Sequence, residues 1–300
     1  MTNTHFTRRS FLQTSALSAG LAASAPLWAS ETKKASLPSS TDILTVGKTG
    51  VKVSRIAQGT GANGYNRQSD QTRLGMERFI KQMRHAYDSG IRFFDLADLY
   101  GSHPYFKNAL QEIPRDELTI LTKVWFAGGG GMPKTDTALP AVERFKQEIG
   151  TDVLDIVLIH CVTNSRWPEQ QKRMREELSE LKEKGTVRAV GCSCHSLDAL
   201  KTAAEDPWVD VIFSRINDKQ KKMDGAPGEV APVLKKARAN GKFVVGMKIY
   251  GCGDLTSAEY RDQSLRYVIG SDLVDAMTIG FDKTEQVDDT MEHVTRVLRA

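Results

Sequence analysis

The sequence predicts a single-domain α/β fold, a closed (β/α)8 or TIM barrel in which eight parallel strands are each followed by a helix. Three observations predict it. Short apolar, β-branched segments alternate with longer amphipathic segments through most of the chain. The strand segments are nearly continuous apolar runs, as expected of parallel strands covered on both faces. About eight such units can be counted, and eight units close into a barrel.

We predict the individual strands and helices from the spacing of apolar residues and from glycines at the ends of helices. We expect strands at 56–59, 91–94, 118–122, 155–159, 186–190, 209–213, 243–246 and 274–279. We expect helices at 72–89, 105–112, 139–148, 168–184, 197–205, 229–239, 258–269 and 284–298. Because parallel neighbours need a crossover of a dozen or more residues, these helices supply the connections.

An open, doubly wound sheet is the alternative fold. Its dinucleotide-binding form carries three glycines after the first strand and an acidic residue about 20 positions later. Gly59-Thr60-Gly61 resembles the opening of that motif, but the third glycine is missing. The barrel is therefore favoured, and Gly59 and Thr60 remain candidates for cofactor binding at the end of the first strand.

The composition excludes several classes of protein. The chain has 300 residues, of which 40% are hydrophobic and 26% charged, near the averages for soluble globular domains. Collagen-like, disordered and disulfide-scaffold proteins are excluded. The formal net charge is only +4, and Arg8 and Arg9 supply two of those charges. The rest of the chain has no basic field for nucleic acid.

The first 29 residues are predicted to be a twin-arginine (Tat) export signal. They contain no Asp, Glu or Lys, and Arg8-Arg9 precede a mild apolar run. Cleavage is expected near Ala29, residues 30–42 are expected to be a linker, and the barrel is expected over 43–300. The mature protein would then be periplasmic or otherwise exported, with the Tat machinery as a partner. The alternative is a chance arginine pair before an uncleaved anchor.

The four cysteines do not indicate a metal site. Cys161, Cys192, Cys194 and Cys252 contain no CxxC pair, so zinc and iron–sulfur patterns are absent from the sequence. Cys192 and Cys194 lie two apart and would point the same way on a strand. We expect small buried side chains, with a disulfide from Cys161 as the alternative.

Polar residues follow three adjacent strands of the expected barrel. Asp95, Lys123 and His160 end strands 2, 3 and 4, and Tyr100 lies five residues after Asp95. In such barrels the loops after the strands form the active site, so the four side chains should converge. Taken singly, each has another explanation: a helix cap, an ion pair, a core histidine or a rim tyrosine.

The four groups suit proton donation to a carbonyl oxygen. The ordinary pKa of Tyr is near 10, and a nearby ammonium is expected to lower the pKa of Tyr100. Asp95 would hold Lys123, and His160 would orient the hydroxyl or the substrate oxygen. A carbonyl that gains a proton on oxygen also needs a hydride on carbon, which no side chain supplies. A nicotinamide cofactor is therefore expected.

Four segments resemble the aldo-keto reductase family, and the resemblance extends from about Asp42 to the C-terminus. They are FFDLADLYG at 93–101, TKVW at 122–125, DIVLIH at 155–160 and GTVRAVG at 185–191. The resemblance implies a (β/α)8 barrel that binds NADPH across the strand ends and reduces aldehydes and ketones reversibly. It implies Tyr100 as the acid, Lys123 and Asp95 as tuning residues, His160 as the carbonyl-orienting residue and Trp125 in the substrate pocket.

The cofactor positions depart from the family pattern. Cys194 stands where the family usually has Asn, Phe213 where it usually has Gln, and Met247 where it usually has an aromatic ring. Ser193 remains a candidate for binding the carboxamide. These four positions are still expected to contact the cofactor, although its reactive end would be held differently.

The segment 280–286 occupies the family's adenosine-phosphate region. Lys283, at a helix start, is a candidate for binding a 2′-phosphate, with Gln286 beside it. A solvated lysine near a cap is the alternative, so the expectation of NADPH comes mainly from the resemblance and NADH stays open. Because the chain ends directly after the last helix, we expect an open site. The run Gly128 to Gly131 is either a partial lid or a plain loop.

The sequence thus predicts an exported NAD(P)H-dependent reductase of a small carbonyl compound. The alternative is a non-catalytic, cofactor-binding or redox-sensing module on the same barrel, which Cys194 and Met247 favour and the four catalytic types oppose. A sugar isomerase or epimerase would need acids and histidines that bind metal at the strand ends, which we do not find.

Overall fold

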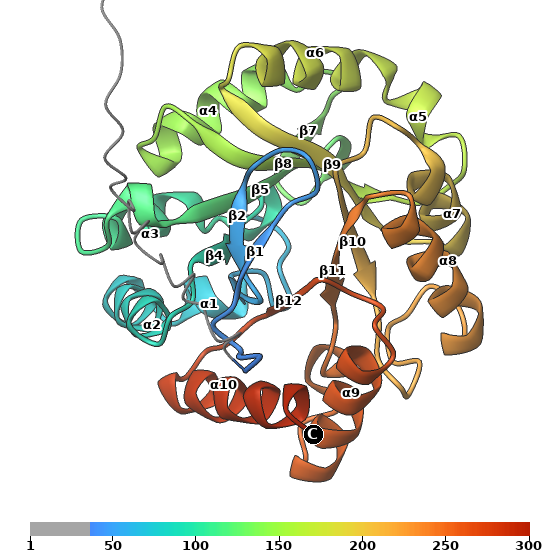
Figure 1. The fold of residues 1–300 in the computed structure, drawn as a ribbon. Coiled ribbons are helices and arrows are strands. Elements are labelled where there is room, and N and C mark those ends of the chain that lie inside the picture. Colours follow the sequence, from blue (N-terminus) through green and yellow to red (C-terminus); the bar gives the residue numbers. More distant parts are fainter. Residues whose placement is uncertain (1–36) are drawn as a thin grey trace, which may run out of the picture. The chain divides into compact units, whose positions relative to one another are not determined.

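The computed structural model describes residues 37–300, and its centre is a closed barrel of eight parallel strands (Figure 1). The strand order around the barrel is β10-β11-β12-β3-β4-β5-β8-β9, and every neighbouring pair is parallel. The predicted (β/α)8 class is confirmed. The barrel strands are β3 (Ile56–Gly59), β4 (Phe93–Asp95), β5 (Thr119–Val124), β8 (Leu154–Val162), β9 (Val187–Cys194), β10 (Val211–Arg215), β11 (Phe243–Met247) and β12 (Ala276–Ile279).

Helices surround the barrel in Figure 1 and connect its strands. Four of them begin and end within one residue of the expected positions, namely α4 (Leu139–Ile149), α7 (Leu197–Glu205), α9 (Ala258–Gly270) and α10 (Thr284–Leu298). The others are α1 (Asp70–Arg73), α2 (Met76–Asp88), α3 (His103–Ala109), α5 (Trp167–Gln170), α6 (Lys172–Glu183) and α8 (Pro227–Ala239).

Two helices that the sequence predicts as continuous are each divided in the structure. The segment 72–89 is broken at Gly75, whose φ of 82° is incompatible with a right-handed helix, so α1 and α2 are separate. The segment 168–184 is broken at Gln171, with φ −109° and ψ 24°, which separates α5 from α6. Apolar periodicity continues across both breaks, so it does not reveal them.

Two hairpins lie outside the predicted pattern. The antiparallel pair β1 (Ile43–Thr45) and β2 (Lys52–Ser54) lies across the barrel in Figure 1 and contributes Val46, Val51 and Val53 to its interior. The second pair is β6 (Ala127–Gly129) and β7 (Met132–Lys134). The glycines at 128–131, expected as a lid or loop, form its turn region, and all four have positive φ.

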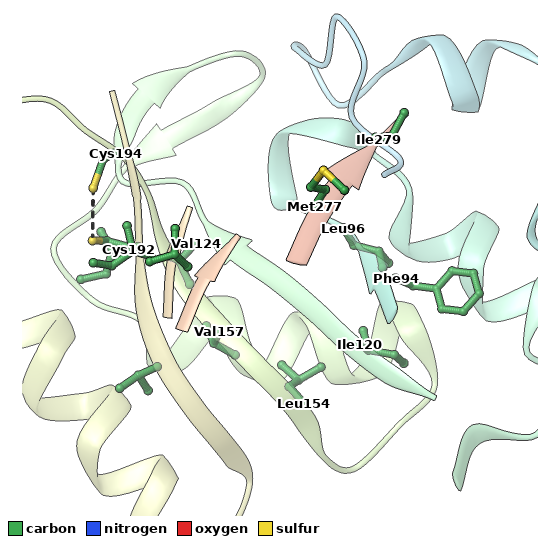
Figure 2. Close-up of a cluster of buried hydrophobic side chains, with 14 of the residues drawn as sticks. Phe94, Leu96, Ile120, Val124, Leu154, Val157, Cys192, Cys194, Met277 and Ile279 are labelled. Atoms are coloured by element: carbon green, nitrogen blue, oxygen red, sulfur yellow. Dashed lines mark hydrogen bonds between the residues drawn. The ribbon is translucent and has the colours of Figure 1, made fainter. Parts of the chain in front are cut away.

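The core has two layers that follow the alternation of side chains along each strand. An inner cluster fills the barrel with residues such as Phe93, Leu121 and Leu158. An outer cluster packs the other strand faces against the helices, and Figure 2 shows part of it, including Phe94, Ile120 and Val157. A residue two positions after an inner-cluster residue on the same strand therefore points into the barrel. This alternation determines which side chains at the strand ends face the barrel interior.

The segment before β1 is packed against the barrel where the structure describes it. Ser40 is buried and its hydroxyl lies 2.8 Å from Thr295 Oγ1 on α10. Asp42 forms an ion pair with Arg55 at 3.0 Å. None of the helices in the described part of the chain combines the length and the apolar character that a membrane crossing requires.

Candidate active site

Strand alternation brings Asp95, Lys123 and His160 together at the carboxyl ends of β4, β5 and β8. These strands are neighbours in the barrel, with Asp95 paired to Leu121 and Lys123 paired to Leu158 in register. All three side chains are buried. Each lies two residues after a member of the inner cluster, in turn Phe93, Leu121 and Leu158.

Asp95 and Lys123 form a buried ion pair at the base of the site. The Lys123 ammonium donates to Asp95 Oδ1 and to the Leu96 carbonyl oxygen, the latter at 3.0 Å. The second carboxylate oxygen of Asp95 accepts a hydrogen bond of 2.9 Å from Thr278 Oγ1 on β12. Burial lowers the pKa of Lys123, and the negative charge of Asp95 opposes that change. Hydrogen bonds therefore compensate much of the cost of burying both charges.

Tyr100 ends the short 3-10 turn η1 (Asp98–Tyr100), which follows β4. Its hydroxyl lies 3.5 Å from His160 Nε2, and the two ring centroids are 5.6 Å apart with an edge-on arrangement. The Lys123 ammonium lies 4.9 Å from the centroid of the Tyr100 ring. The structure thus places all four strand-end residues of the sequence prediction around one point.

The expected net lowering of the pKa of Tyr100 is wrong in direction. Burial raises the pKa of Tyr100 well above its usual value, and the negative charge of Asp95 raises it further, with smaller contributions from Cys161 and Cys252. The positive charge of Lys123 is directed at Asp95 and Leu96, while Lys123 makes no hydrogen bond to the phenol among the described contacts. Tyr100 therefore holds its proton at neutral pH.

His160 is held as a neutral imidazole. Burial lowers its pKa well below the usual value, and the positive charges of Lys123 and Lys248 act in the same direction. Its ring also lies edge-on to Trp125, with centroids 5.8 Å apart. Its Nδ1 is buried and has no hydrogen-bond partner within residues 37–300.

A cavity of about 470 Å³ begins at the four residues and extends to the start of α10. Its wall includes the whole catalytic set of the prediction, namely Asp95, Tyr100, Lys123 and His160. It also includes most of the expected cofactor residues, namely Gly59, Ser193, Phe213, Met247 and Gln286. Three expected cofactor residues and the expected substrate residue do not line it, namely Thr60, Cys194, Lys283 and Trp125.

Strand direction and hydrogen bonding explain two of these exceptions. Ser193 points into the barrel, so Cys194 points outward and packs beside Cys192, with the two sulfurs 3.8 Å apart (Figure 2). The Thr60 hydroxyl is buried and donates to the Asp95 carbonyl oxygen at 2.9 Å, with Ser102 Oγ also 2.9 Å away. Thr60 therefore stabilises the backbone of Asp95 and does not face the cavity.

The remaining two exceptions lie next to residues of the cavity wall. Lys283 is the exposed residue that precedes α10, and its backbone N–H donates to Gln286 Oε1 at 3.3 Å. Trp125 donates from Nε1 to the Gly128 carbonyl oxygen at 2.9 Å, which fixes its ring beside His160 above the cavity wall. All four cysteines are free, so the alternative of a disulfide from Cys161 is wrong.

Among the side chains of the cavity wall that the sequence analysis missed are His195, Lys248, Arg261 and Thr278. Three of them had a local signal. His195 and Lys248 directly follow β9 and β11, where strand-end polar residues gather, and Thr278 is a polar residue in an apolar strand. Arg261 lies inside α9 and reaches the cavity only through tertiary packing.

His195 belongs to a neutral hydrogen-bonded group at the mouth of the site. Burial lowers the pKa of His195 to about 3, with the charge of Arg215 as the next cause, and burial raises the pKa of Cys161 to about 11. His195 Nε2 lies 3.3 Å from Cys161 Sγ, and the Cys161 N–H donates to Ser193 Oγ at 2.8 Å. This group fixes Ser193 in the wall.

Replacing Asp95 by Asn should leave the Lys123 ammonium buried without its counter-charge. We expect the free energy of unfolding, measured by urea denaturation, to fall by about 3–5 kcal/mol. The double variant Asp95→Asn/Lys123→Met should recover a large part of that loss, because it removes the unpaired charge. Strictly additive losses in the two single variants and the double variant would contradict the pairing.

Comparisons with known proteins identify the family of this chain. The model of the Aldo/keto reductase family matches residues 55–297. The chain is 32% identical over 136 residues to methylglyoxal reductase DkgB of Yersinia pestis, which covers 44% of this chain and 48% of the relative. It is 31% identical over 138 residues to 9,11-endoperoxide prostaglandin H2 reductase of Trypanosoma cruzi, which covers 43% and 45%. The chain thus spans about half the length of the curated relatives it matches.

A solved structure shows the same fold. Aldo-keto reductase AKR11C1 from Bacillus halodurans superposes with a TM-score of 0.67 at 18% identity, covering 86% of this chain and 91% of that one. This likeness extends over the whole barrel, and the match to the family model covers nearly all of it. The protein belongs to the aldo/keto reductase family.

Proposed function

We propose that this protein reduces the carbonyl group of an aldehyde or ketone to an alcohol, with a reduced nicotinamide dinucleotide as the second substrate and Tyr100 as the proton donor. The single observation that carries the proposal is the Tyr100 hydroxyl beside His160 Nε2 and the Lys123 ammonium, in the wall of one cavity. Membership of the aldo/keto reductase family supports the cofactor class.

The residues of the cavity fit a nicotinamide dinucleotide. Near Tyr100 the wall offers the Ser193 hydroxyl together with the apolar faces of Phe213 and Met247, which suit a planar ring and its carboxamide. Two buried nitrogens of wall residues lack partners within the described chain, His160 Nδ1 and Arg261 Nε. When bound, a reduced nicotinamide supplies the hydride that the carbonyl carbon takes up.

The protein's own groups handle the proton. A carbonyl oxygen between the Tyr100 hydroxyl and His160 Nε2 accepts hydrogen bonds that orient it, and the phenol proton moves to that oxygen as the alcohol forms. The phenolate that remains is stabilised by the Lys123 ammonium, 4.9 Å from the ring centroid. Burial gives this attraction a low effective dielectric constant. Asp95 keeps the ammonium in place.

Substitution of Tyr100 by Phe tests the proton donor. We expect kcat to fall by about 10²–10⁴-fold, the range of a general acid, while the Kd of the cofactor changes little. The measurements are carbonyl reduction followed by nicotinamide absorbance and cofactor binding followed by fluorescence quenching. Tyr260→Phe, at an exposed tyrosine on α9, is the matched control and should behave as the unsubstituted protein. Equal rates in Tyr100→Phe and in the control would contradict the proposal.

A non-catalytic module is the other function that the sequence suggests. One of the two observations in its favour is lost, because Cys194 faces the outer core instead of the cofactor. Met247 still lines the cavity, but so do the four catalytic side chains. Reduction is therefore the better-supported function.

We propose NADPH as the preferred cofactor, with Arg261 in the role that the sequence analysis gives to Lys283. Arg261 lies in the cavity wall near the start of α10, its Nη1 pairs with Asp289 at 3.0 Å, and its buried Nε has no partner in the described chain. A guanidinium beside the start of a 15-residue helix suits a 2′-phosphate. Asp282, also in the wall, acts against phosphate and favours a free ribose hydroxyl.

Binding measurements on Arg261→Gln decide between the two cofactors. We expect the unsubstituted protein to bind NADPH more tightly than NADH, as followed by fluorescence quenching. The substitution should weaken NADPH binding by about tenfold, the value of one charge-assisted hydrogen bond, and leave the Kd of NADH nearly unchanged. Tighter binding of NADH by the unsubstituted protein would contradict the assignment.

We also propose that residues 1–29 are a Tat export signal, whereas the expected linker 30–42 ends earlier than predicted, because Ser40 and Asp42 already contact the barrel. The signal lies outside the described residues, and its support is the Arg8-Arg9 pair before an apolar run that lacks acids and lysines. Since Tat carries folded proteins, the barrel would be exported with its cofactor already bound.

Cell fractionation tests the export signal. When the full chain is expressed in a bacterium that has the Tat pathway, a processed protein with an N-terminus near Ser30 should appear in the periplasm. The double variant Arg8→Lys/Arg9→Lys should remain in the cytoplasm at full length. Periplasmic, processed protein from that variant would contradict Tat export.

A further inference from the structure

The loop between β3 and α1, residues 60–69, packs directly on the Tyr100 ring, and we call it the glycine loop. A Cβ atom on Gly61 would lie 2.2 Å from Tyr100 Cε2, and one on Gly64 would lie 2.4 Å from Tyr100 Cδ1. No side chain fits at either position, so the loop backbone itself covers the ring. The position of Tyr100 therefore depends on where this loop lies.

The glycine loop also contacts the residue after Tyr100. Gly101 ends η1 with a φ of +65°, and a Cβ atom there would lie 1.9 Å from the Arg67 carbonyl oxygen. The loop thus touches the catalytic turn at two places, the phenol ring and the backbone behind it. The position of the loop and the position of the Tyr100 ring therefore depend on each other.

The side chain of Arg67 anchors the glycine loop to two other elements. Its Nη2 donates to Glu148 Oε1 on α4 at 2.8 Å, and its Nη1 lies 3.8 Å from Asp98 Oδ1 at the start of η1. The same Nη1 lies 3.8 Å from Met132 Sδ on β7. Arg67 is the loop residue whose side chain joins α4, the catalytic turn and the β6–β7 hairpin.

The anchors of Arg67 are themselves held by side chains of α4 and α3. Arg144 on α4 donates to both oxygens of Asp98, at 2.9 and 2.8 Å. His103 bridges Glu148 Oε2 at 2.9 Å and Thr122 Oγ1 at 2.8 Å, directly before Lys123 in β5. Burial opposes it, but hydrogen bonds from His103 and Arg67 lower the pKa of Glu148 to about 2, so Glu148 is charged.

We propose that Arg67 is a positioning residue, which clamps the glycine loop onto Tyr100 and keeps the phenol fixed and shielded from water. The catalytic part of this inference rests on the proposed role of Tyr100 as proton donor, whereas the shielding does not. Without the Glu148 and Asp98 contacts, nothing in the described side-chain network ties Arg67 and the loop around it to α4. Water then reaches the ring past Gly61 and Gly64.

Tyr100 is partly buried, and burial is the largest cause of its raised pKa, so the covering of its ring by the loop has a measurable consequence. The groups that face the phenol are Asp95, Lys123, His160, Cys161 and Cys252. None of them lies on the glycine loop, so its opening changes hydration and leaves these charges in place. The pKa of Tyr100 should therefore fall toward its ordinary value when the clamp is removed.

The test is Arg67→Gln, examined by two readouts. The first is the phenolate absorbance titration of Tyr100, isolated by subtracting the curve of the same protein carrying Tyr100→Phe. We expect its midpoint at lower pH than in the unsubstituted chain. The second is the pH profile of kcat, whose alkaline limb should move to lower pH, with kcat reduced about 10–100-fold and a smaller change in the KM of the carbonyl.

Arg175→Gln is the matched control. Arg175 is a partly buried arginine on α6 that donates to both oxygens of Asp206, at 2.9 and 2.8 Å, and does not line the cavity. Its loss should reduce stability without moving either readout. Arg67→Lys should restore part of kcat, since its ammonium can still pair with Glu148. If Arg67→Gln does not fold, Glu148→Gln removes the same anchor from α4 and carries the same expectations.

The inference is overturned if Arg67→Gln and Arg175→Gln give the same Tyr100 titration and the same alkaline limb as the unsubstituted protein. The absorbance titration needs no turnover, so it separates two failures. Absence of carbonyl reduction in the unsubstituted protein would count against the proposed function, while the titration alone would still decide whether Arg67 shields the phenol.

Discussion

The buried Asp95–Lys123 ion pair is the interaction on which the site depends. An ammonium inside a barrel is tolerated because a carboxylate and a backbone carbonyl oxygen accept its protons, and the carboxylate in turn accepts a hydrogen bond from Thr278. Three strands, β4, β5 and β12, are thereby tied together at one end of the barrel. Tyr100 and His160 are arranged around the Lys123 ammonium, whose position Asp95 and the Leu96 carbonyl oxygen determine.

Burial then determines the protonation of the neighbouring groups. The same low-dielectric surroundings that raise the pKa of Tyr100 lower the pKa of His160, so that both are neutral at physiological pH. A neutral acid beside a neutral imidazole can orient a polar carbonyl without adding a net charge. The cation below the phenol matters most after the proton has left, when it faces a phenolate.

The parts of the molecule that follow from local pattern were predictable from the sequence. The barrel follows from eight apolar strands, and Asp95, Lys123 and His160 follow from alternation at strand ends. Cys194 was misassigned because its alignment position matches a cofactor residue while the strand turns its side chain outward. The direction of the Tyr100 pKa required knowing its burial, and no local pattern could predict that Arg67 or Arg261 would approach the site from loops and helices distant in sequence.

The β1–β2 hairpin limits the routes by which ligands can reach the cavity. Val46, Val51 and Val53 fill the barrel from the side opposite the catalytic strand ends, so the described interior offers no passage from one rim to the other. In the proposed reaction, a dinucleotide and a carbonyl compound would therefore enter and leave through the same opening. Of the two, the compound that lies deeper in this opening would have to bind first and leave last.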